Sequence, residues 1–442
     1  MSKFLHGPLA VIVGFYLALG IAFAVTVPAW QVPDEPAHYN YIRQIAQQGQ
    51  IPVLMPGDYD GAFNMQRIAP PHAQLSEADR AQLEAVQYED HQPPLYYLLA
   101  APIFALTNGS LLALRLFSVL LGALGIGLTW LALREVFPER PGVVAFATAL
   151  VALLPQHVFM LAGVNNDALA EALLALVVWL TLRLIVRGRA PTAAEAGALA
   201  VTLGLCFLTK TTAYYMPPVA GLAVLALSRR GRVWVFHVGL FAALAALIGL
   251  PWWARNLALY GGTDVMGLTR HDLVVVGQTT TAEWIAAHGW LSADPESYLV
   301  RGARFTFQSW WGMFGWLSVA LPGWLYAALL AFSVLSLALF VAYAIRAARK
   351  LSNGQKQALL ALAGLTVVTI LGFVWYNTKY VQHQGRYLFP ALIPAALAVS
   401  LGWHQVLARL PALADRAWLL FTGLMVVLDG YALLRVIAPA LR

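Results

Sequence analysis

The chain has 442 residues, of which 60% are hydrophobic and only 11% are charged, and its formal net charge is +7. A soluble domain carries about 25% charged residues, so this composition excludes an ordinary soluble protein and predicts an all-α polytopic membrane protein. The basic residues fall mainly in short linkers between apolar runs, where membrane topology rather than nucleic acid accounts for them.

Eleven apolar runs are candidate membrane-spanning helices. They cover residues 8–30, 110–136, 141–162, 168–186, 193–209, 211–228, 233–253, 321–345, 357–376, 387–407 and 416–438. We expect the first run to be a retained helix, because it is too long for a typical signal peptide. A further run, 94–107, would cover only about 20 Å of a bilayer core of about 30 Å. We expect that run to be a half-inserted or surface helix.

With 94–107 not spanning, all the basic linkers lie on one side of the membrane, and the positive-inside rule makes that side cytoplasmic. The N-terminus is then cytoplasmic and the C-terminus external, in a bacterial inner (plasma) membrane. We expect one transmembrane domain over 1–442, with external loops at 31–92 and 254–320 and C-terminal spans at 321–438.

The first external loop opens with "QVPDEPAHYNYIRQ" at residues 31–44. Apolar residues at helical spacing predict a helix over 35–48 that ends at Gly49. A second short helix is expected over 76–87, where Ser76 and Asp79 form a variant of the capping box.

Polar residues gather on the expected external side, many of them at the ends of spans. Three cations, Lys210, Arg255 and Arg386, could form the base of one external cavity. Three acids, Asp34, Glu35 and Asp167, could form its rim. Cations at a membrane edge can hold a lipid phosphate, and a neighbouring carboxylate can take a proton from an attacking hydroxyl or amine. This pairing suggests group transfer from a lipid-phosphate donor to an external acceptor.

Each acidic or histidine candidate near the first loop also has a plainer interpretation. Asp34 could be a catalytic base, or it could be the N-cap of the 35–48 helix. Glu35 could be a helper of that base, a metal ligand, or an acid in the first turn of the helix. His38 suits a metal ligand, a donor contact or a partly buried interfacial residue. His91 suits a substrate contact or a local hydrogen bond that secures the loop, and Asp167 a second acidic site or a helix cap.

The cations have alternatives as well. Lys210 suits a phosphate contact or a turn residue that extends outward, and Arg255 a phosphate contact or an interface anchor. Arg386 is a candidate phosphate contact because it lies at the external start of a span, whereas most basic residues lie on the cytoplasmic side. Glu171 and Asp429 lie within spans, where charge is costly, so partners are expected for them.

Several motifs together resemble the GT-C superfamily of membrane glycosyltransferases. The acidic pair after the first span is followed by the "HQPPLYYLL" return to the bilayer. "GVNNDALAEAL", "GLCFLTKTT", "PWWARNLALYG", "SWWGMFGW" and "QGRYLFPALIP" resemble a bacterial branch of predicted membrane proteins in that superfamily. The likeness is closest to bacterial relatives of the protein O-mannosyltransferases and of the lipid A aminoarabinose transferase.

The resemblance implies a GT-C-like bundle of about eleven spans with short interfacial helices in its two long external loops. It implies a polyprenyl-phosphate sugar donor, an inverting displacement, Asp34 as the general base and Glu35 as its neighbour. The acceptor is a glycan, a lipid or a protein, and membrane lipids surround the chain. A divalent metal stays undecided, since some members of the superfamily require one and others do not.

Two other functions remain open from the sequence. One is a transporter or flippase of a lipid-linked or anionic substrate, which favours charged or broken helices near the middle of the membrane. The other is a non-catalytic scaffold of the same fold. The clustering of polar residues at one face favours the transferase.

Overall fold

The computed structural model describes residues 3–59, 76–227, 232–347, 350–409 and 416–441. The elements up to residue 260 are α1 (Lys3–Thr26), α2 (Glu35–Gln48), α4 (Glu77–Ala85), α5 (Leu95–Leu106), α6 (Leu111–Val136), α7 (Pro141–Ala152), α8 (Pro155–Leu161), α9 (Asp167–Arg187), α10 (Ala193–Phe207), η2 (Thr211–Tyr215), α11 (Met216–Leu227) and α12 (Arg232–Tyr260). The remaining elements are α13 (Leu268–Val274), α14 (Thr281–His288), α15 (Tyr298–Trp311), β1 (Met313–Phe314), β2 (Val319–Ala320), α16 (Gly323–Ala347), α17 (Asn353–Asn377), η3 (Gly385–Ala391), α18 (Leu392–Leu407), α20 (Ala417–Tyr431), η4 (Ala432–Ile437) and α21 (Ala438–Leu441). The all-α prediction is confirmed; the only sheet in the described residues is the two-stranded antiparallel pair β1–β2, in which Met313 faces Ala320.

The described residues hold eight helices that are long and apolar enough to cross a membrane, or nine if the bent pair α7–α8 is one span. The axis bends by 59° between these two short helices. The expected count of about eleven is therefore not confirmed. The difference lies in the runs 193–209 and 211–228, which are helical but too short, because a 3-10 turn at η2 separates α10 from α11.

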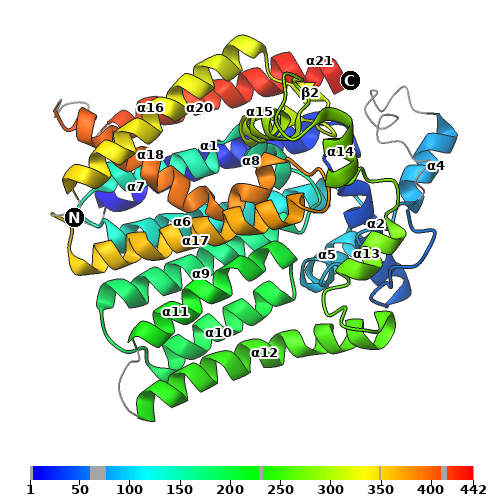
Figure 1. The fold of residues 1–442 in the computed structure, drawn as a ribbon, viewed down its shortest axis with the longest axis horizontal. Helices are drawn as coiled ribbons and strands as arrows, with labels where there is room; N and C mark the ends of the chain where they lie inside the picture. The colour runs from blue at the N-terminus through cyan, green and yellow to red at the C-terminus, as the bar shows by residue number, and fades with distance from the viewer. Residues whose placement is uncertain (1–2, 60–75, 228–231, 348–349, 410–415, 442) are drawn as a thin grey trace.

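The long helices lie side by side in Figure 1, and the short helices α2, α4, α5 and α13 gather at one end of the bundle. The N-terminus lies at the opposite end, on the left of the view. The chain therefore has the expected shape of a helical bundle that carries its short helices at one end.

The interior of the bundle is formed by α6, α7, α8 and α9. Every residue of α7 from Val143 to Ala152 is buried, whereas α16 and α17 expose large apolar side chains such as Leu337 and Leu360. A helix that is apolar all round suits either a buried core or contact with lipid. α6 packs closely on α9 at Gly125, where an added Cβ would lie 3.4 Å from the Ala172 Cα, at van der Waals contact.

The short helices at the site end agree closely with the sequence. α2 covers the predicted 35–48 segment and ends at Gly49, which has a φ of 68°. α5 has 12 residues, too few to span, as expected of the 94–107 run. At the start of α4, the Asp79 backbone N–H donates to Ser76 Oγ and the Asp79 carboxylate accepts from the Ser76 N–H. The second long loop begins later than expected, because α12 continues to Tyr260.

Candidate functional site

The adjacent acids Asp34 and Glu35 lie in the turn between α1 and α2, and their side chains point to different places. Asp34 occupies the N-cap position of α2 in a left-handed conformation, with φ 67° and ψ −5°, and its side chain makes no capping hydrogen bond. The interpretation of this side chain as a helix cap is therefore wrong. Few non-glycine residues adopt this conformation, although Asp tolerates it better than most. The turn frees the Asp34 carboxylate for partners outside its own helix.

Two donors from distant parts of the chain hold the Asp34 carboxylate. The Tyr88 hydroxyl donates to Oδ1 at 2.7 Å, and the Arg386 Nη2 donates to Oδ2 at 2.7 Å. Burial favours the protonated acid, but the Arg386 charge and the Tyr88 hydrogen bond outweigh it and lower the pKa of Asp34 to about 2. The side chain is only 18% exposed. Asp34 is thus an ionised and mostly enclosed carboxylate.

Arg386 reaches Asp34 because η3 packs tightly on α15. The first residue of η3 is Gly385, whose backbone N–H donates to Ser309 Oγ at 2.8 Å. A Cβ added to Gly385 would lie 2.3 Å from the Trp310 backbone nitrogen. Only glycine permits this approach, which sets the position of the next residue, Arg386.

A second carboxylate–cation pair lies beside the first. Lys210, between α10 and η2, places Nζ 2.7 Å from Oδ1 of Asp167, the first residue of α9. The charges of Lys210, Asp34, Asp167 and Arg386 all act on the imidazole of His38. The structure therefore brings five of the eight candidate residues into one cluster.

Glu35 lies outside this cluster in a fully buried ion pair with Arg115 of α6. Arg115 donates through Nε to Oε1 at 2.7 Å and through Nη2 to Oε2 at 2.6 Å. The backbone N–H groups of Trp30 and Val164 also donate to the Glu35 carboxylate. Arg115 further donates to three carbonyls at the end of α1, those of Ala24, Val27 and Pro28. This network fixes the turn that presents Asp34.

His38 lies on α2, one turn after Asp34, and is buried. Its Nδ1 is 2.8 Å from the Tyr97 hydroxyl. Burial and the charge of Lys210 lower the pKa of His38 to about 3, so the imidazole is neutral at pH 7. A neutral imidazole is the form that ligates a metal.

Asp34, His38 and Glu89 are the group of described residues that could hold a metal ion. Their ligand atoms all lie within 4.8 Å of one another. Glu89 Oε2 is buried and has no hydrogen-bond partner among the described residues. Burial and the charge of Asp34 raise the pKa of Glu89 to about 7. Two carboxylates and one imidazole suit a divalent cation such as Mn²⁺ or Zn²⁺.

The remaining two candidates, His91 and Arg255, contact backbone carbonyl groups. His91 Nδ1 is 3.1 Å from the Tyr88 carbonyl oxygen, which matches the expected local hydrogen bond. Arg255 Nη2 donates to the carbonyls of Ile51 and Pro52, so this guanidinium ties the first loop to α12.

Three residues of the site were not predicted from the sequence: Tyr88, Glu89 and Arg115. Tyr88 and Glu89 lie in "YEDHQPP", three and two residues before the candidate His91, and this closeness in the sequence could have indicated them. Arg115 sits inside an apolar run, and the cost of a charge in such a run indicates a partner without naming it.

Comparison with solved structures finds two proteins that are similar to this chain. The Archaeoglobus fulgidus oligosaccharyltransferase, solved with a tethered acceptor peptide, is similar over 99% of this chain with a TM-score of 0.53 and 15% identity. This chain spans 55% of the length of that protein. ArnT from Cupriavidus metallidurans bound to undecaprenyl phosphate is similar over 93% of this chain and 81% of its own, with a TM-score of 0.43 and 14% identity.

The oligosaccharyltransferase likeness shows that the expected GT-C-type fold is correct. No curated protein matches the sequence. The family described as "Predicted membrane protein (DUF2142)" matches residues 62–394, which is more than half of the chain. The chain therefore belongs to the DUF2142 family of predicted membrane proteins.

Proposed function

We propose that this protein is a membrane glycosyltransferase that moves a sugar from a polyprenyl-phosphate donor to an acceptor at the external face of a bacterial inner membrane. The reaction inverts the sugar carbon, and Asp34 is the general base. The observation that carries this proposal is the contact between the ionised Asp34 carboxylate and the Arg386 guanidinium, at 2.7 Å. The fold is shared with an oligosaccharyltransferase that was captured with an acceptor peptide, which supports transfer chemistry.

The two ion pairs give the site a way to activate its base when the donor binds. Arg386 and Lys210 are neutralised by Asp34 and Asp167. An arriving phosphate competes for both cations, because it offers them charge-assisted hydrogen bonds of the same kind as the two carboxylates do. As Arg386 turns toward the phosphate, Asp34 loses the neighbour that lowers its pKa and becomes a stronger base.

The transfer step follows from this arrangement. Asp34 takes the proton of the acceptor hydroxyl while the acceptor oxygen attacks the sugar carbon from the face opposite the phosphate. The bond between the sugar carbon and the phosphate oxygen breaks, and the phosphate leaves with the electron pair. Lys210 and Arg386 stabilise the charge that develops on the leaving phosphate.

A large apolar cavity beside the site is suited to the lipid tail of the donor. Its volume is about 970 Å³, and α14, α15, α16, α17 and η3 contribute to its lining. Aromatic side chains such as Phe307, Trp310 and Phe373 face it, together with Leu388, two residues after Arg386. A tail in this cavity would therefore place its phosphate near Arg386. Apolar cavities of this size are typical of sites for large ligands.

The other candidate residues take supporting roles in this proposal. Glu35 is a positioning residue, because its ion pair with Arg115 fixes the turn that carries Asp34. His91 and Arg255 hold the first loop in place. A divalent cation held by Asp34, His38 and Glu89 would supply Lewis-acid stabilisation of the leaving phosphate.

The test is a transfer assay with purified protein in lipid nanodiscs. The protein is incubated with membrane lipid extracts that carry radiolabelled polyprenyl-phosphate sugars, and released polyprenyl phosphate is measured by mass spectrometry. The wild type should release lipid phosphate, and Asp34→Asn should lose at least about 100-fold in rate while its thermal unfolding stays cooperative, as expected of a folded protein. A folded Asp34→Asn variant with full activity would remove Asp34 from the mechanism.

The second candidate is a transporter, and the break between α7 and α8 is the observation that favours it. The charged pair at this break is His157 of α8 and Glu171 of α9. Glu171 lies about one turn from the start of α9, at the end of the bundle that holds the site rather than at its middle. Movement of intact lipid-linked sugar across sealed vesicles without release of lipid phosphate would establish the transporter instead.

A further inference from the structure

The contact between His157 and Glu171 requires a proton on one of the two side chains. His157 Nδ1 is 2.7 Å from the Val151 carbonyl oxygen, which can only accept, so Nδ1 carries a hydrogen. His157 Nε2 contacts Glu171 Oε2 directly. Without a proton between them, two lone pairs would face each other. The pair therefore holds one shared proton, either as imidazolium and carboxylate or as imidazole and carboxylic acid.

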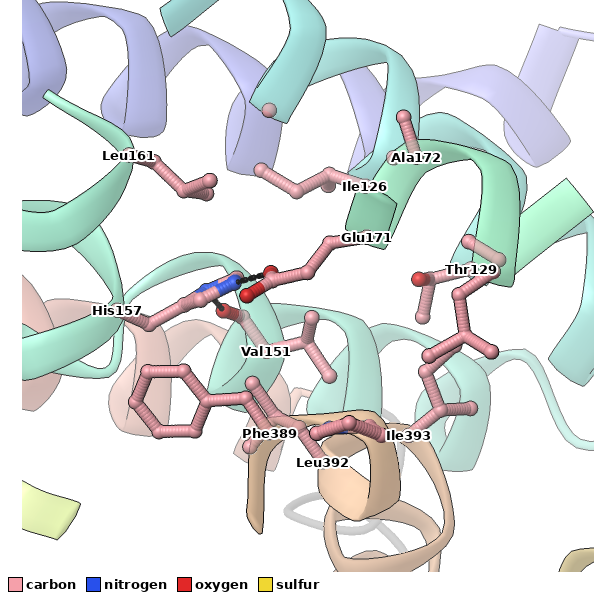
Figure 2. Close-up of a pocket in the computed structure, with 15 residues that line it drawn as sticks. Ile126, Thr129, Val151, His157, Leu161, Glu171, Ala172, Phe389, Leu392 and Ile393 are labelled. Carbon is pink, nitrogen blue, oxygen red and sulfur yellow. Dashed lines mark hydrogen bonds and ion pairs between the residues drawn. The ribbon is translucent and has the colours of Figure 1, made fainter. Parts of the chain in front are cut away.

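The pair faces a small cavity in the bundle. Figure 2 shows His157 and Glu171 pointing toward each other, and Thr129 lines the same cavity. The cavity has a volume of about 30 Å³ and is lined by parts of α6, α7, α8, α9 and η3. A water molecule needs about 10–15 Å³ and two or more polar partners. Thr129 and Glu171 supply such partners, since both ring nitrogens of His157 are already bonded.

A second small cavity connects Glu171 with the proposed active site. Its volume is about 20 Å³, and Asp167, Glu171, Thr212 and Arg386 line it. Asp167 and Glu171 are four residues apart on α9, so they lie on the same helical face. Arg386 Nη1 is buried and has no hydrogen-bond partner among the residues that the structure describes. Water in this cavity would satisfy that donor and join Glu171 to both ion pairs of the site.

The charges around the pair are few. On the elements packed against it, the titratable or charged groups that face it are Tyr16 of α1, Asp167 of α9, Lys210 beside Asp167, and Arg386 and Tyr387 of η3. The two carboxylate–cation pairs are each neutral as a unit. The proton between His157 and Glu171 is therefore governed mainly by these two residues.

We propose that His157 and Glu171 form a proton-exchanging pair that receives, through water in the second cavity, the proton released by the transfer reaction. This inference rests on the proposed function. The acceptor O–H bond breaks, its proton goes first to Asp34, and water passes it on to the His157–Glu171 pair, which then holds two protons, as imidazolium and carboxylic acid. The phosphate leaves with the electrons of its bond to the sugar. Asp34 cannot retain the proton once Arg386 returns to it, so a separate receiver resets the base.

The matched variants are Glu171→Gln and Thr129→Val. A glutamine at 171 can donate its N–H to His157 Nε2, so the contact survives without the shared proton. Thr129→Val keeps the shape of the first cavity and changes no titratable group. Nitrogen-15 histidine NMR and carboxyl infrared spectra of the protein in nanodiscs would report the protonation states of the His157 ring and the Glu171 carboxyl group without any substrate. Signals of His157 are assigned by their loss in His157→Gln.

The wild type should show either a doubly protonated His157 ring or a carboxylic-acid band at neutral pH. That signal should be lost in Glu171→Gln and kept in Thr129→Val. Asp167→Asn should lower the pH at which the pair loses its proton by about one unit, because a nearby negative charge is removed. A wild type with neither signal, or a midpoint unmoved by Asp167→Asn, would overturn the proposal.

The transfer assay then tests the coupling to catalysis. Glu171→Gln should lower kcat by about 10-fold and change its pH profile while the KM for the donor stays within two-fold. Thr129→Val should behave as wild type. An unchanged kcat in Glu171→Gln at every pH would overturn the coupling. If the wild type transfers no sugar from any donor, the proposed function fails, whereas the spectra still decide whether the proton pair exists.

Discussion

Arg386 donates to the Asp34 carboxylate at 2.7 Å although the two residues are 352 positions apart in the chain. One belongs to the turn after the first helix and the other to η3, after α17. Their contact therefore ties the acidic loop to the C-terminal helices. Arg386 also lines the second cavity, together with Asp167 and Glu171.

Replacing Arg386 with lysine should weaken donor binding. Lysine keeps the positive charge but lacks the planar guanidinium with its several N–H donors. It therefore cannot donate to Asp34 and into the second cavity at the same time. We expect donor affinity to fall about 10-fold, which corresponds to about 1.4 kcal/mol. The measurement is binding of a polyprenyl phosphate to protein in nanodiscs by native mass spectrometry. Arg189→Lys is the control, because Arg189 pairs with Glu195 in an exposed linker; an equal loss there would remove the specific role of Arg386.

Glu35→Gln should act through stability rather than chemistry. The substitution leaves the buried Arg115 charge without its carboxylate, and breaking a buried ion pair costs about 3–5 kcal/mol. Thermal unfolding in detergent should show a large drop, and the double variant Glu35→Gln with Arg115→Met should recover part of it. The control is Glu195→Gln, whose half-exposed pairs with Arg187 and Arg189 are worth at most about 1 kcal/mol. A Glu35→Gln protein that is as stable as wild type but inactive would return Glu35 to the catalytic machinery.

The contrast between Asp34 and Glu35 shows which parts of the site the sequence can predict and which it cannot. The apolar runs predicted the bundle well, because hydropathy decides membrane helices. The grouping of polar residues at one end led to Asp34, Lys210 and Arg386, which the structure does bring together. The sequence could not tell which of two adjacent acids faces the site, since that depends on one left-handed residue.

The other parts of the site depend on contacts between residues that are far apart in the chain, and the sequence does not indicate such contacts. Arg115 lies 80 positions from Glu35, so nothing local indicates their pairing. Glu171 was expected to need a partner, but His157 becomes one only because the chain bends between α7 and α8. The span count of eleven failed for a related reason: the short 3-10 turn at η2, directly after Lys210, has no clear hydropathy signal.

Stability should fall as the pH rises from about 4 to 8, because Glu89 and Asp90 are buried acids. Burial raises the pKa of Glu89 from 4.5 to about 7 and that of Asp90 from 3.8 to about 8. The folded protein thus binds more protons than the unfolded chain in this range, and the stabilisation present at low pH is lost as pH rises through the folded pKa values. At about 1.4 kcal/mol for each pKa unit, the effect is on the order of 3 kcal/mol for Glu89 and about 6 kcal/mol for Asp90.

Unfolding temperatures measured from pH 5 to pH 8.5 would check this. Glu89→Gln and Asp90→Asn should each reduce the decrease in unfolding temperature between pH 5 and pH 8.5, because amides do not titrate. Glu283→Gln is the control, since this exposed acid has a lowered pKa and caps α14. A pH profile unaffected by both buried substitutions would show that these acids are not the source of the dependence.

Divalent metal binding should depend on Glu89 and should strengthen with pH. A cation at Asp34, His38 and Glu89 must displace the proton that Glu89 holds near neutrality. Isothermal titration with Mn²⁺ or Zn²⁺ should therefore give tighter binding at pH 8 than at pH 6, and Glu89→Gln should weaken it by at least about 10-fold. Equal affinity in the wild type and Glu89→Gln would place any bound metal elsewhere.

The orientation of the bundle can be tested by labelling a single introduced cysteine. Cys206 is fully buried, so the wild type serves as the unlabelled control. Gly57 lies in the exposed part of the first loop, where an added side chain meets nothing within 4 Å, and Lys356 is exposed in the first turn of α17. Because the basic linkers place the α17 start inside, a membrane-impermeant maleimide should label Gly57→Cys in intact cells and Lys356→Cys only after permeabilisation. The reverse pattern would put Asp34 and Arg386 on the cytoplasmic side, where a donor with an outward-facing sugar could not reach them.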